Sequence, residues 1–442
     1  MARALFFSIF VFLMAADPVA AQKNREEKVR DDRRKVMAEG FWIYNDLAAG
    51  FAEAKKNGKP LLVALRCIPC EACVKLDDDL VDRDRRVRPL LEKFVCVRLV
   101  STNGLDLSLF QYDYDQSFAV FLLNADGTIY GRFGTRSHRT IWEDDVSVAG
   151  LAAALRGALD LHAEYPKNKA VLAAKRGPKP EFPSPEHYPM LRGKYGPKLD
   201  YSGKFVASCI HCHQIGDAQR QLVRDRRQSF PDKLLFPYPH PKSIGLILDP
   251  TKKASVRRVD DGSPAARSGF RASDEIVSLE GQPLLSIADV QWVLHNAGDE
   301  ASLAARVRRD VETISVTLTL PKGWRRRDTI SWRSSSWALR RMVAGGLLLE
   351  ELSPDERKKG GLAETGMALR VRHVGEFGPH AAAKQAGFRP GDIVVSFDGK
   401  TELVRETDLL AYALNAHPPG ERVPVVVRHG RERIELSLPM QE

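Results

Sequence analysis

An internal repeat in the C-terminal part of the chain constrains the fold more than any other feature. When the sequence is shifted by 118 residues, seven of the thirteen positions from Gly269 to Gly281 are identical to those from Gly387 to Gly399. Each copy contains a short helix of small residues, a glycine at its end, an apolar strand that starts at an aspartate, and a Glu-Gly or Asp-Gly turn. A second helix follows in both copies, over 287–296 and 406–415, and a closing strand comes after it. The repeat therefore predicts two related domains.

The region before the repeat divides into an α/β domain, a linker and a cysteine-containing segment. With 442 residues the chain is too long for one small domain. Apolar runs alternate with helical patterns from residue 36 to 166, which predicts an α/β domain, and six prolines between Lys175 and Lys198 predict a stiff linker. The predicted boundaries are 36–166 for the α/β domain, 167–198 for the Pro-rich linker, 199–242 for the cysteine-containing segment, 243–321 for the first repeat domain, 322–344 for a Trp- and Arg-rich linker, and 345–440 for the second repeat domain.

Local patterns predict the elements of the α/β domain. The charged segment Lys23–Lys35 has no apolar period, so we expect a solvated helix or a tail there. We expect helices over Leu47–Lys56 and Val148–Tyr165, and strands over Leu61–Leu65, Phe94–Leu99, Ser117–Leu123 and Thr128–Phe133, the last two joined as a hairpin.

The N-terminus has the pattern of an export signal. Arg3 precedes the apolar run Leu5–Ala16, and small residues follow at Ala20 and Ala21. We expect a signal peptide over 1–21, no transmembrane segment elsewhere, and a protein that is periplasmic or secreted, where cysteines meet an oxidising medium. The 67 Lys and Arg exceed the 57 Asp and Glu, but this excess is spread along the chain, so we expect no specific nucleic-acid site.

Cys209-Ile-His-Cys212-His213 forms a C-x-x-C-H motif. It resembles the attachment site of c-type cytochromes, and the resemblance implies covalent haem c, with thioethers at Cys209 and Cys212 and His213 as the proximal iron ligand. Two alternatives stay open from the residues: a local disulfide, or a zinc site formed by both thiolates with His211 or His213.

A sixth iron ligand is not evident from the sequence. Typical cytochrome c domains supply a methionine well downstream, whereas the first methionine after this motif, Met342, lies between the repeats. His240, between two prolines, is the preferred candidate, and its alternative role is an exposed turn histidine. Met190 and His187 of the Pro-rich linker, or no protein ligand, are the other possibilities.

Cys67, Cys70 and Cys73, here called the N-terminal thiols, follow the first expected strand of the α/β domain. This arrangement resembles the thioredoxin-like family, whose redox pair opens the helix after a central strand, where the helix dipole favours the thiolate. The resemblance assigns exchange to Cys70 and Cys73, with Cys67 as a third thiol. Phe118 stands where the family has a cis-proline, so a static disulfide is the alternative. Cys96, on an expected strand, is interpreted as a core thiol.

The two repeat domains resemble PDZ domains of the HtrA type, which are partly open β-barrels. The resemblance rests on Ser243-Ile244-Gly245-Leu246 and Gly345-Gly346-Leu347-Leu348, which match the loop that holds a peptide C-terminal carboxylate. It implies peptide binding at Gly245, Leu246, Gly346 and Leu347, in grooves walled by 290–294 and 409–414. The alternative is that both domains are packing modules docked on their neighbours. The chain has no Gly-x-Ser-x-Gly nucleophile turn, so we expect no protease site.

Two functions follow from these motifs. The first is extracytoplasmic redox work that combines haem electron transfer, thiol–disulfide chemistry as a possible oxidoreductase, and PDZ-mediated binding of a protein partner. The second is a non-catalytic PDZ scaffold or adaptor with a structural disulfide in an inactive thioredoxin fold. The redox partner cannot be identified from the sequence.

Overall fold

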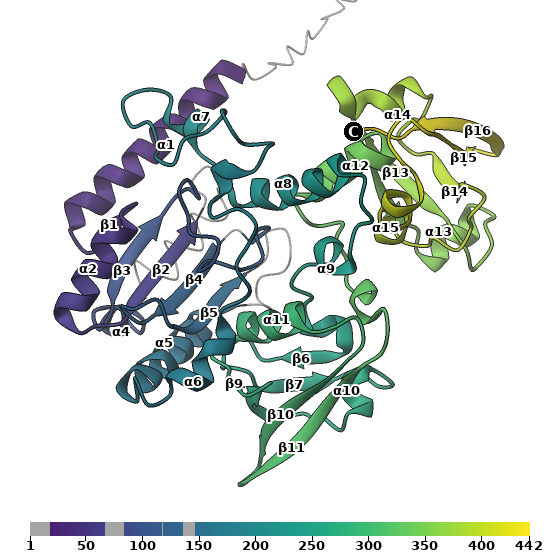
Figure 1. Ribbon diagram of the computed structural model, residues 1–442. Helices are drawn as coiled ribbons and strands as arrows, with labels where there is room; N and C mark the ends of the chain where they lie inside the picture. The colour runs from purple at the N-terminus through teal and green to yellow at the C-terminus, as the bar shows by residue number, and fades with distance from the viewer. Residues whose placement is uncertain (1–17, 67–83, 117, 136–145) are drawn as a thin grey trace, which may run out of the picture.

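The computed structural model describes residues 18–66, 84–116, 118–135 and 146–442. The α/β domain, which comes first, is a mixed five-stranded sheet with the strand order β1-β3-β2-β4-β5 (Figure 1). Its β1, β3 and β2 are parallel, and β4 and β5 form an antiparallel hairpin. Its described elements are α1 (Pro18–Glu39), β1 (Ile43–Tyr44), α2 (Leu47–Asn57), β2 (Leu61–Arg66), α4 (Arg88–Leu91), β3 (Val95–Leu99), β4 (Phe118–Leu123), β5 (Ile129–Thr135), α5 (Val148–Ala163) and α6 (Lys169–Leu172).

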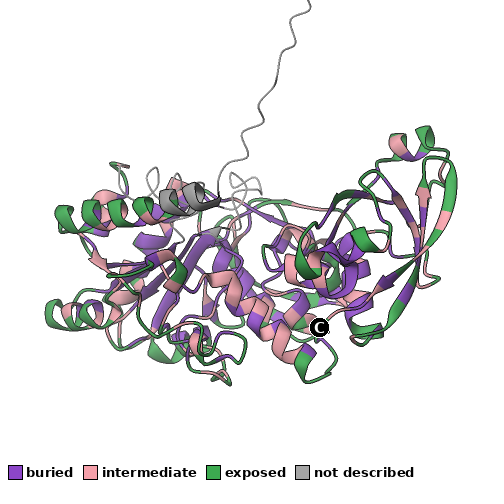
Figure 2. Ribbon diagram, turned by 90° about the horizontal axis from the view of Figure 1, so that it is seen from above, coloured by how far each residue is buried: buried purple, intermediate pink, exposed green. Residues whose placement is uncertain are grey.

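Local sequence signals explain these elements. Asp46 caps α2 by accepting a hydrogen bond from the Ala49 N–H, and Gly58 ends the helix with a φ of 63°. Every residue of β2 is buried, as its unbroken apolar run predicts (Figure 2). The expected strands, the hairpin and the two helices are confirmed to within a few residues.

The charged N-terminal segment was expected to be a solvated helix or a tail, and the helix is confirmed, with most of its described side chains exposed. It forms α1, and one side of this helix is buried because Val29 and Val36 pack on the domain. Asp32 of α1 also forms an ion pair with Arg66 at the end of β2. Isolated valines and one aspartate do not produce a visible apolar period in so charged a segment.

The residues between the α/β domain and the first repeat pack against the α/β domain rather than standing off as a spacer. The Leu107 N–H donates to the Pro183 carbonyl at 2.9 Å, and Gln111 Nε2 donates to the Pro178 carbonyl at 2.9 Å. Short elements break up this region: η3 (Ala173–Lys175), η4 (Pro185–His187), α7 (Phe205–Ser208), α8 (Cys212–Asp225), α9 (Asp232–Leu235) and η5 (Pro241–Ile244).

Each repeat forms its own domain, with open sheets. In the first, β6 and β7 pair separately from a sheet ordered β11-β10-β8-β9, and in the second the order is β12-β13-β14-β15-β16. No sheet among the described strands closes on itself, so the repeat domains, expected to be partly open barrels, consist of open antiparallel sheets. The first repeat domain contains β6 (Leu246–Leu248), β7 (Val256–Val259), α10 (Pro264–Arg267), β8 (Glu275–Leu279), β9 (Gln282–Pro283), α11 (Ile287–Asn296), β10 (Ala301–Arg309) and β11 (Glu312–Leu320). After η6 (Trp324–Arg327), the second contains α12 (Ser336–Ala344), β12 (Leu347–Glu351), α13 (Pro354–Lys359), β13 (Leu369–Val374), η7 (Gly378–Ala381), α14 (Ala382–Gln385), β14 (Ile393–Phe397), α15 (Glu406–Ala416), β15 (Arg422–His429) and β16 (Glu432–Pro439).

The identical residues of the repeat have the same structural role in both copies. Gly269 and Gly387 have φ values of 88° and 102°, a conformation that strains residues with a Cβ. Buried Asp274 accepts from the Arg271 N–H at 2.9 Å, and Asp392 accepts from the Arg389 N–H at 2.9 Å. The repeated residues therefore form the same turn in both domains, and a buried aspartate stabilises it in each.

Candidate functional site

The carboxyl ends of β2 and β3 lie at the same edge of the α/β sheet. Arg66, at the end of β2, is the last residue described before the segment 67–83, so the N-terminal thiols Cys67, Cys70 and Cys73 lie outside the described residues. Arg66 pairs in register with Phe118, the residue expected at the cis-proline position. The structure therefore shows at which edge of the sheet β2 ends and the chain enters the segment that contains the N-terminal thiols.

The C-x-x-C-H motif is docked at this edge. The backbone N–H and the hydroxyl of Thr102 both donate to the Ile210 carbonyl, at 3.0 and 2.9 Å, and the Ile210 N–H donates to Asn103 Oδ1 at 2.8 Å. Arg66 and Cys212 line the same small void, of about 10 Å³. The structure thus places this motif beside the end of β2, about 140 residues away along the chain.

Both cysteines of the motif are thiols in apolar surroundings. Cys209 is 5% exposed and donates from Sγ to the Phe205 carbonyl at 3.3 Å. Burial raises its pKa to about 12. Burial also raises the pKa of the Cys212 thiol, and Tyr112, which donates to its Sγ at 3.0 Å, partly offsets this. Both groups are therefore protonated at neutral pH.

The neighbouring histidines are neutral. The rings of His211 and His213 are parallel, with centroids 5.8 Å apart. Burial lowers the pKa of His211 to about 4 and also lowers that of His213. A neutral imidazole can ligate a metal. However, no three His, Cys, Asp or Glu side chains within the described ranges are arranged to hold a metal ion.

As described, the motif would have to rearrange to hold a porphyrin. Thioether attachment needs both sulfurs and the imidazole at one open face, whereas Cys209 packs in a cluster with Val29 and Phe205, and Cys212 packs in another. None of Cys209, Cys212 and His213 lines the cavity of about 500 Å³ that is described below.

The candidate sixth ligands lie elsewhere. His240 is buried, not exposed as its alternative role supposed, and its Nδ1 accepts from the Lys242 N–H at 3.1 Å in the turn that begins η5. His187 bonds Ser184, and Met190 is exposed.

In the first repeat domain, the chain itself surrounds the helix expected to wall a peptide groove. Asp289 of α11 accepts from the Arg132 N–H of β5 at 3.1 Å and forms an ion pair with Lys175 at 3.0 Å. On another side of α11, Gln291 donates to the Tyr238 carbonyl at 3.1 Å. In the expected carboxylate loop, the Gly245 N–H donates to the Lys242 carbonyl, and Leu246 pairs with Val259.

In the second repeat domain, a buried ion pair ties α12 to the groove. Arg340 of α12 donates from Nε and Nη2 to the two oxygens of Glu406 at 2.9 and 2.6 Å. Glu406 also accepts from the Leu349 N–H of β12 at 2.9 Å, and the Gly346 N–H donates to the Arg340 carbonyl at 3.0 Å. Glu406 therefore already accepts a hydrogen bond from a backbone N–H of the strand beside the expected groove.

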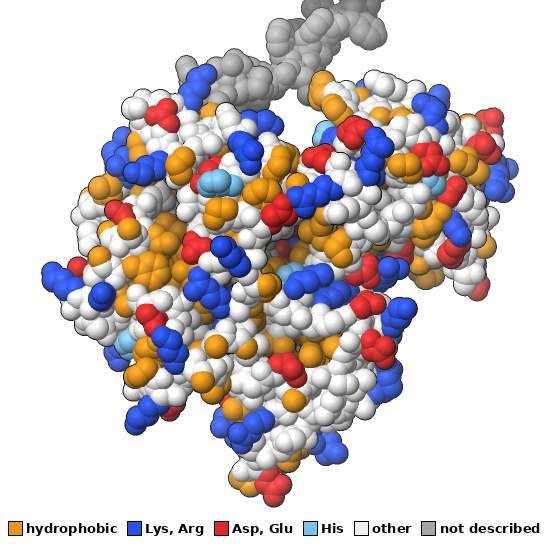
Figure 3. All heavy atoms as spheres, in the orientation of Figure 1, with side chains coloured by type: hydrophobic (Ala, Val, Ile, Leu, Met, Phe, Trp, Pro, Cys, Tyr) orange, Lys and Arg blue, Asp and Glu red, His pale blue; other side chains and the backbone are white. Residues whose placement is uncertain are grey.

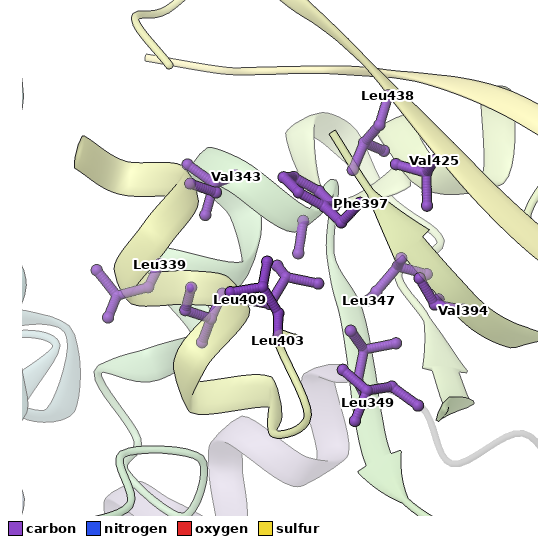
Figure 4. Packing of buried hydrophobic residues seen from close by; sticks show 14 of the residues in the cluster. Leu339, Val343, Leu347, Leu349, Val394, Phe397, Leu403, Leu409, Val425 and Leu438 are labelled. Atoms are coloured by element: carbon purple, nitrogen blue, oxygen red, sulfur yellow. The ribbon is translucent and has the colours of Figure 1, made fainter. Parts of the chain in front are cut away.

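Apolar contacts reinforce this arrangement. Leu339 and Val343 of α12 share one core with Leu409 of α15 and with Leu347 and Leu349 of β12 (Figure 4). Sequence reasoning missed Arg340, Glu406 and Tyr112 because their partners are distant in sequence; the only signal was that Arg340 follows an Arg- and Trp-rich segment.

Comparison with known proteins identifies two of the domains. Residues 42–125 match the thioredoxin-like family. Residues 241–320 match the PDZ domain family. The chain therefore contains a thioredoxin-like domain and a PDZ domain. No described helix is both long enough and apolar enough to cross a membrane.

Several curated proteins are similar to part of the chain. A probable periplasmic serine endoprotease DegP-like from Pseudomonas fluorescens is 29% identical over 182 residues, which is 40% of this chain and 36% of that protein. A protein of the same name from Chlamydia trachomatis is 27% identical over 177 residues, which is 40% of this chain and 32% of that protein. The chain thus spans about a third of the relatives' length.

Parts of two solved structures are similar to part of this chain. The HtrA-type protease AlgW with a decapeptide has 14% identity and a TM-score of 0.21, covering 32% of this chain and 48% of that one. AlgW with a tripeptide has 15% identity and a TM-score of 0.20, covering 32% of this chain and 52% of that one.

Proposed function

We propose that this is an extracytoplasmic thiol–disulfide redox protein in which the N-terminal thiols exchange with the C-x-x-C-H cysteines. The observation that carries the proposal is the docking of Ile210 on Thr102, which holds the motif at the edge where β2 ends. The thioredoxin-like match supports it, because that family carries its redox pair after this strand. The buried C-x-x-C-H sulfurs favour the protonated dithiol, so the attacking thiolate comes from the N-terminal thiols.

The exchange conserves electrons and protons. The Cys70 thiolate attacks a Cys209–Cys212 disulfide, and a mixed disulfide forms while the displaced sulfur takes up a proton. The Cys73 thiolate then attacks Cys70 in the mixed disulfide, and the second C-x-x-C-H sulfur is released and protonated. Two electrons move from the N-terminal pair to the C-x-x-C-H pair, and the two protons lost by Cys70 and Cys73 equal the two gained. A dithiol protein partner would reduce the N-terminal pair again, and a second partner that carries a disulfide would reoxidise Cys209 and Cys212, which are thiols in this structure.

The partner would be recruited by the repeat domains in the periplasm. The PDZ match supports peptide or protein binding, and the expected signal peptide and the relatives named periplasmic support the location. Binding at Gly245 and Leu246 or at Gly346 and Leu347 by strand addition would require the internal contacts of these loops to open.

Trapping the mixed disulfide tests the exchange. In the full chain carrying Cys73→Ala, the second step is blocked, and we expect a Cys70 link to Cys209 or Cys212 in peptide mass spectrometry without reductant. Cys96→Ala is the matched control and should leave the link unchanged. Absence of the Cys70 link in the Cys73→Ala chain would refute exchange and leave the adaptor function.

Covalent haem c on Cys209, Cys212 and His213 is the second candidate, favoured by the C-x-x-C-H spacing and by the neutral state of the His213 ring. It would require the two sulfurs to leave their separate clusters. Intact mass after export in a cell with haem maturation should then exceed the polypeptide by about 616 Da. A bare polypeptide mass would contradict it.

A further inference from the structure

A cavity of about 500 Å³ lies where the α/β domain, α8 and the first repeat domain meet. Its lining includes residues of α8, α9 and α11, and Figure 1 shows where these three helices lie in the chain. Its walls come from the loop after β3, the Pro-rich segment, α8, the turn before η5, and the end of α11. This volume lies within the range of small-molecule sites.

Aromatic side chains form much of the wall: Tyr112, Tyr114, Phe182, Tyr188, Tyr238 and Trp292. Burial raises the pKa of all four tyrosines, so their hydroxyls stay neutral. Such a wall fits a planar apolar body, because aromatic rings pack well against each other by edge or offset contacts.

Arg220 of α8 lies in the same wall, and most of its N–H donors make no hydrogen bond with a described residue. Its side chain is 1% exposed, yet the guanidinium makes one hydrogen bond within the described part of the chain, from Nη1 to Ser335 Oγ. Its Nε has no partner there, and it forms no ion pair with a described carboxylate. A guanidinium has five N–H donors, and leaving them unused in a buried position is costly.

The acidic groups of the wall have other partners. Asp113 and Asp115 both pair with Arg333, and Asp115 also accepts from the Ser335 N–H at 2.8 Å. Glu181 pairs with Arg226. Asp115, and more weakly Asp217 and Asp113, attract Arg220 from beyond ion-pair distance, so its charge is partly compensated while its Nε and Nη2 donors make no hydrogen bond with a described residue. The unused donors of Arg220 are therefore left for a ligand.

We propose that this cavity binds a small aromatic anion, whose carboxylate or sulfonate pairs with Arg220 while its rings pack on the tyrosines and Trp292. Guanidinium groups bind such oxyanions through two parallel hydrogen bonds. The ligand would contact α8, which begins at Cys212, and would lie beside Ser335, which precedes α12.

Two fluorescent probes that differ by one charged group test the proposal. The anionic probe is 8-anilinonaphthalene-1-sulfonate, and N-phenyl-1-naphthylamine lacks its sulfonate. We expect the full chain to bind one equivalent of each by calorimetric or fluorescence titration. Arg220→Met should weaken the anionic probe by roughly tenfold or more and change the neutral probe by less than about twofold.

Further variants separate the cavity from the rest of the surface. Gln219→Trp fills the cavity and should abolish binding of both probes, whereas Gln228→Trp, at an exposed position just after α8, should change neither. Thermal unfolding of the ligand-free Arg220→Met chain checks that this variant is folded before its probe affinities are compared with those of the parent. Equal affinity of Arg220→Met and the parent chain for the anionic probe would overturn the proposal, as would failure of the parent chain to bind it.

Discussion

Asp217 of α8 should make the protein less stable as the pH rises from about 4 to 7. Burial raises its pKa from 3.8 to about 7, and attraction to Arg220 and Arg341 only partly opposes this. Its Oδ1 has no hydrogen-bond partner among the described residues. Between these two pH values the folded state holds a proton that the unfolded state has released, so stability is present at low pH and is lost as the pH rises.

The size of the effect follows from the same values. At ~1.4 kcal/mol per pH unit, the rise from 3.8 to about 7 corresponds to about 4 kcal/mol in all, of which about 3 kcal/mol falls between pH 5 and pH 8. Residual solvent contact lowers this, so we expect about 2–3 kcal/mol. Asp217→Asn removes the titration without changing the shape of the side chain.

Urea unfolding of the parent chain and of Asp217→Asn at pH 5 and pH 8 measures this difference. The free energy of unfolding of Asp217→Asn, relative to the parent, should be about 2–3 kcal/mol higher at pH 8 than at pH 5. Asp225→Asn, at an exposed position at the end of α8, is the control and should show no such change. Parallel pH curves for the parent and Asp217→Asn would refute the reasoning.

Three further predictions concern other parts of the chain. Arg340→Met should lower the free energy of unfolding by about 3–5 kcal/mol in urea titration, because Glu406 is left buried without its partner, and adding Glu406→Leu should recover part of this loss. Gly387→Ala should cost about 1–2 kcal/mol in the same assay, because the φ of 102° strains a residue with a Cβ. Iodoacetamide at pH 8 should modify Cys209 about a thousandfold more slowly than an exposed thiol, since its pKa is about 12 against about 8.5 for a free cysteine, and equal rates in mass spectrometry would contradict this.

Elements with a clear local pattern could be predicted from the sequence. The helix expected over 287–296 has the same bounds in the structure, because its apolar spacing and its Ser286 cap are local signals. The charged segment was expected to be a solvated helix or a tail and forms the helix α1, but the burial of Val29 and Val36 on the domain could not be predicted from so weak an apolar pattern.

Contacts between segments distant in sequence could not be predicted. The hydrogen bonds from Thr102 to Ile210 join residues 108 positions apart, and neither segment has a sequence pattern that indicates the other as its partner. The same holds for Arg333, which was interpreted as part of a basic linker but is buried against Asp113. On the face seen in Figure 3, by contrast, basic and acidic side chains are mixed, as their distribution along the sequence predicts.

The position of α11 also has a consequence for solubility. β5 is the last strand of its sheet, and strands in that position expose backbone groups to which another molecule's strand can add. Here the Arg132 N–H donates a hydrogen bond to Asp289, and the Arg132 carbonyl accepts one from the Ser286 hydroxyl. A fragment that ends before residue 240 would uncover this strand, so proteolysis within the connecting region should promote aggregation through strand addition.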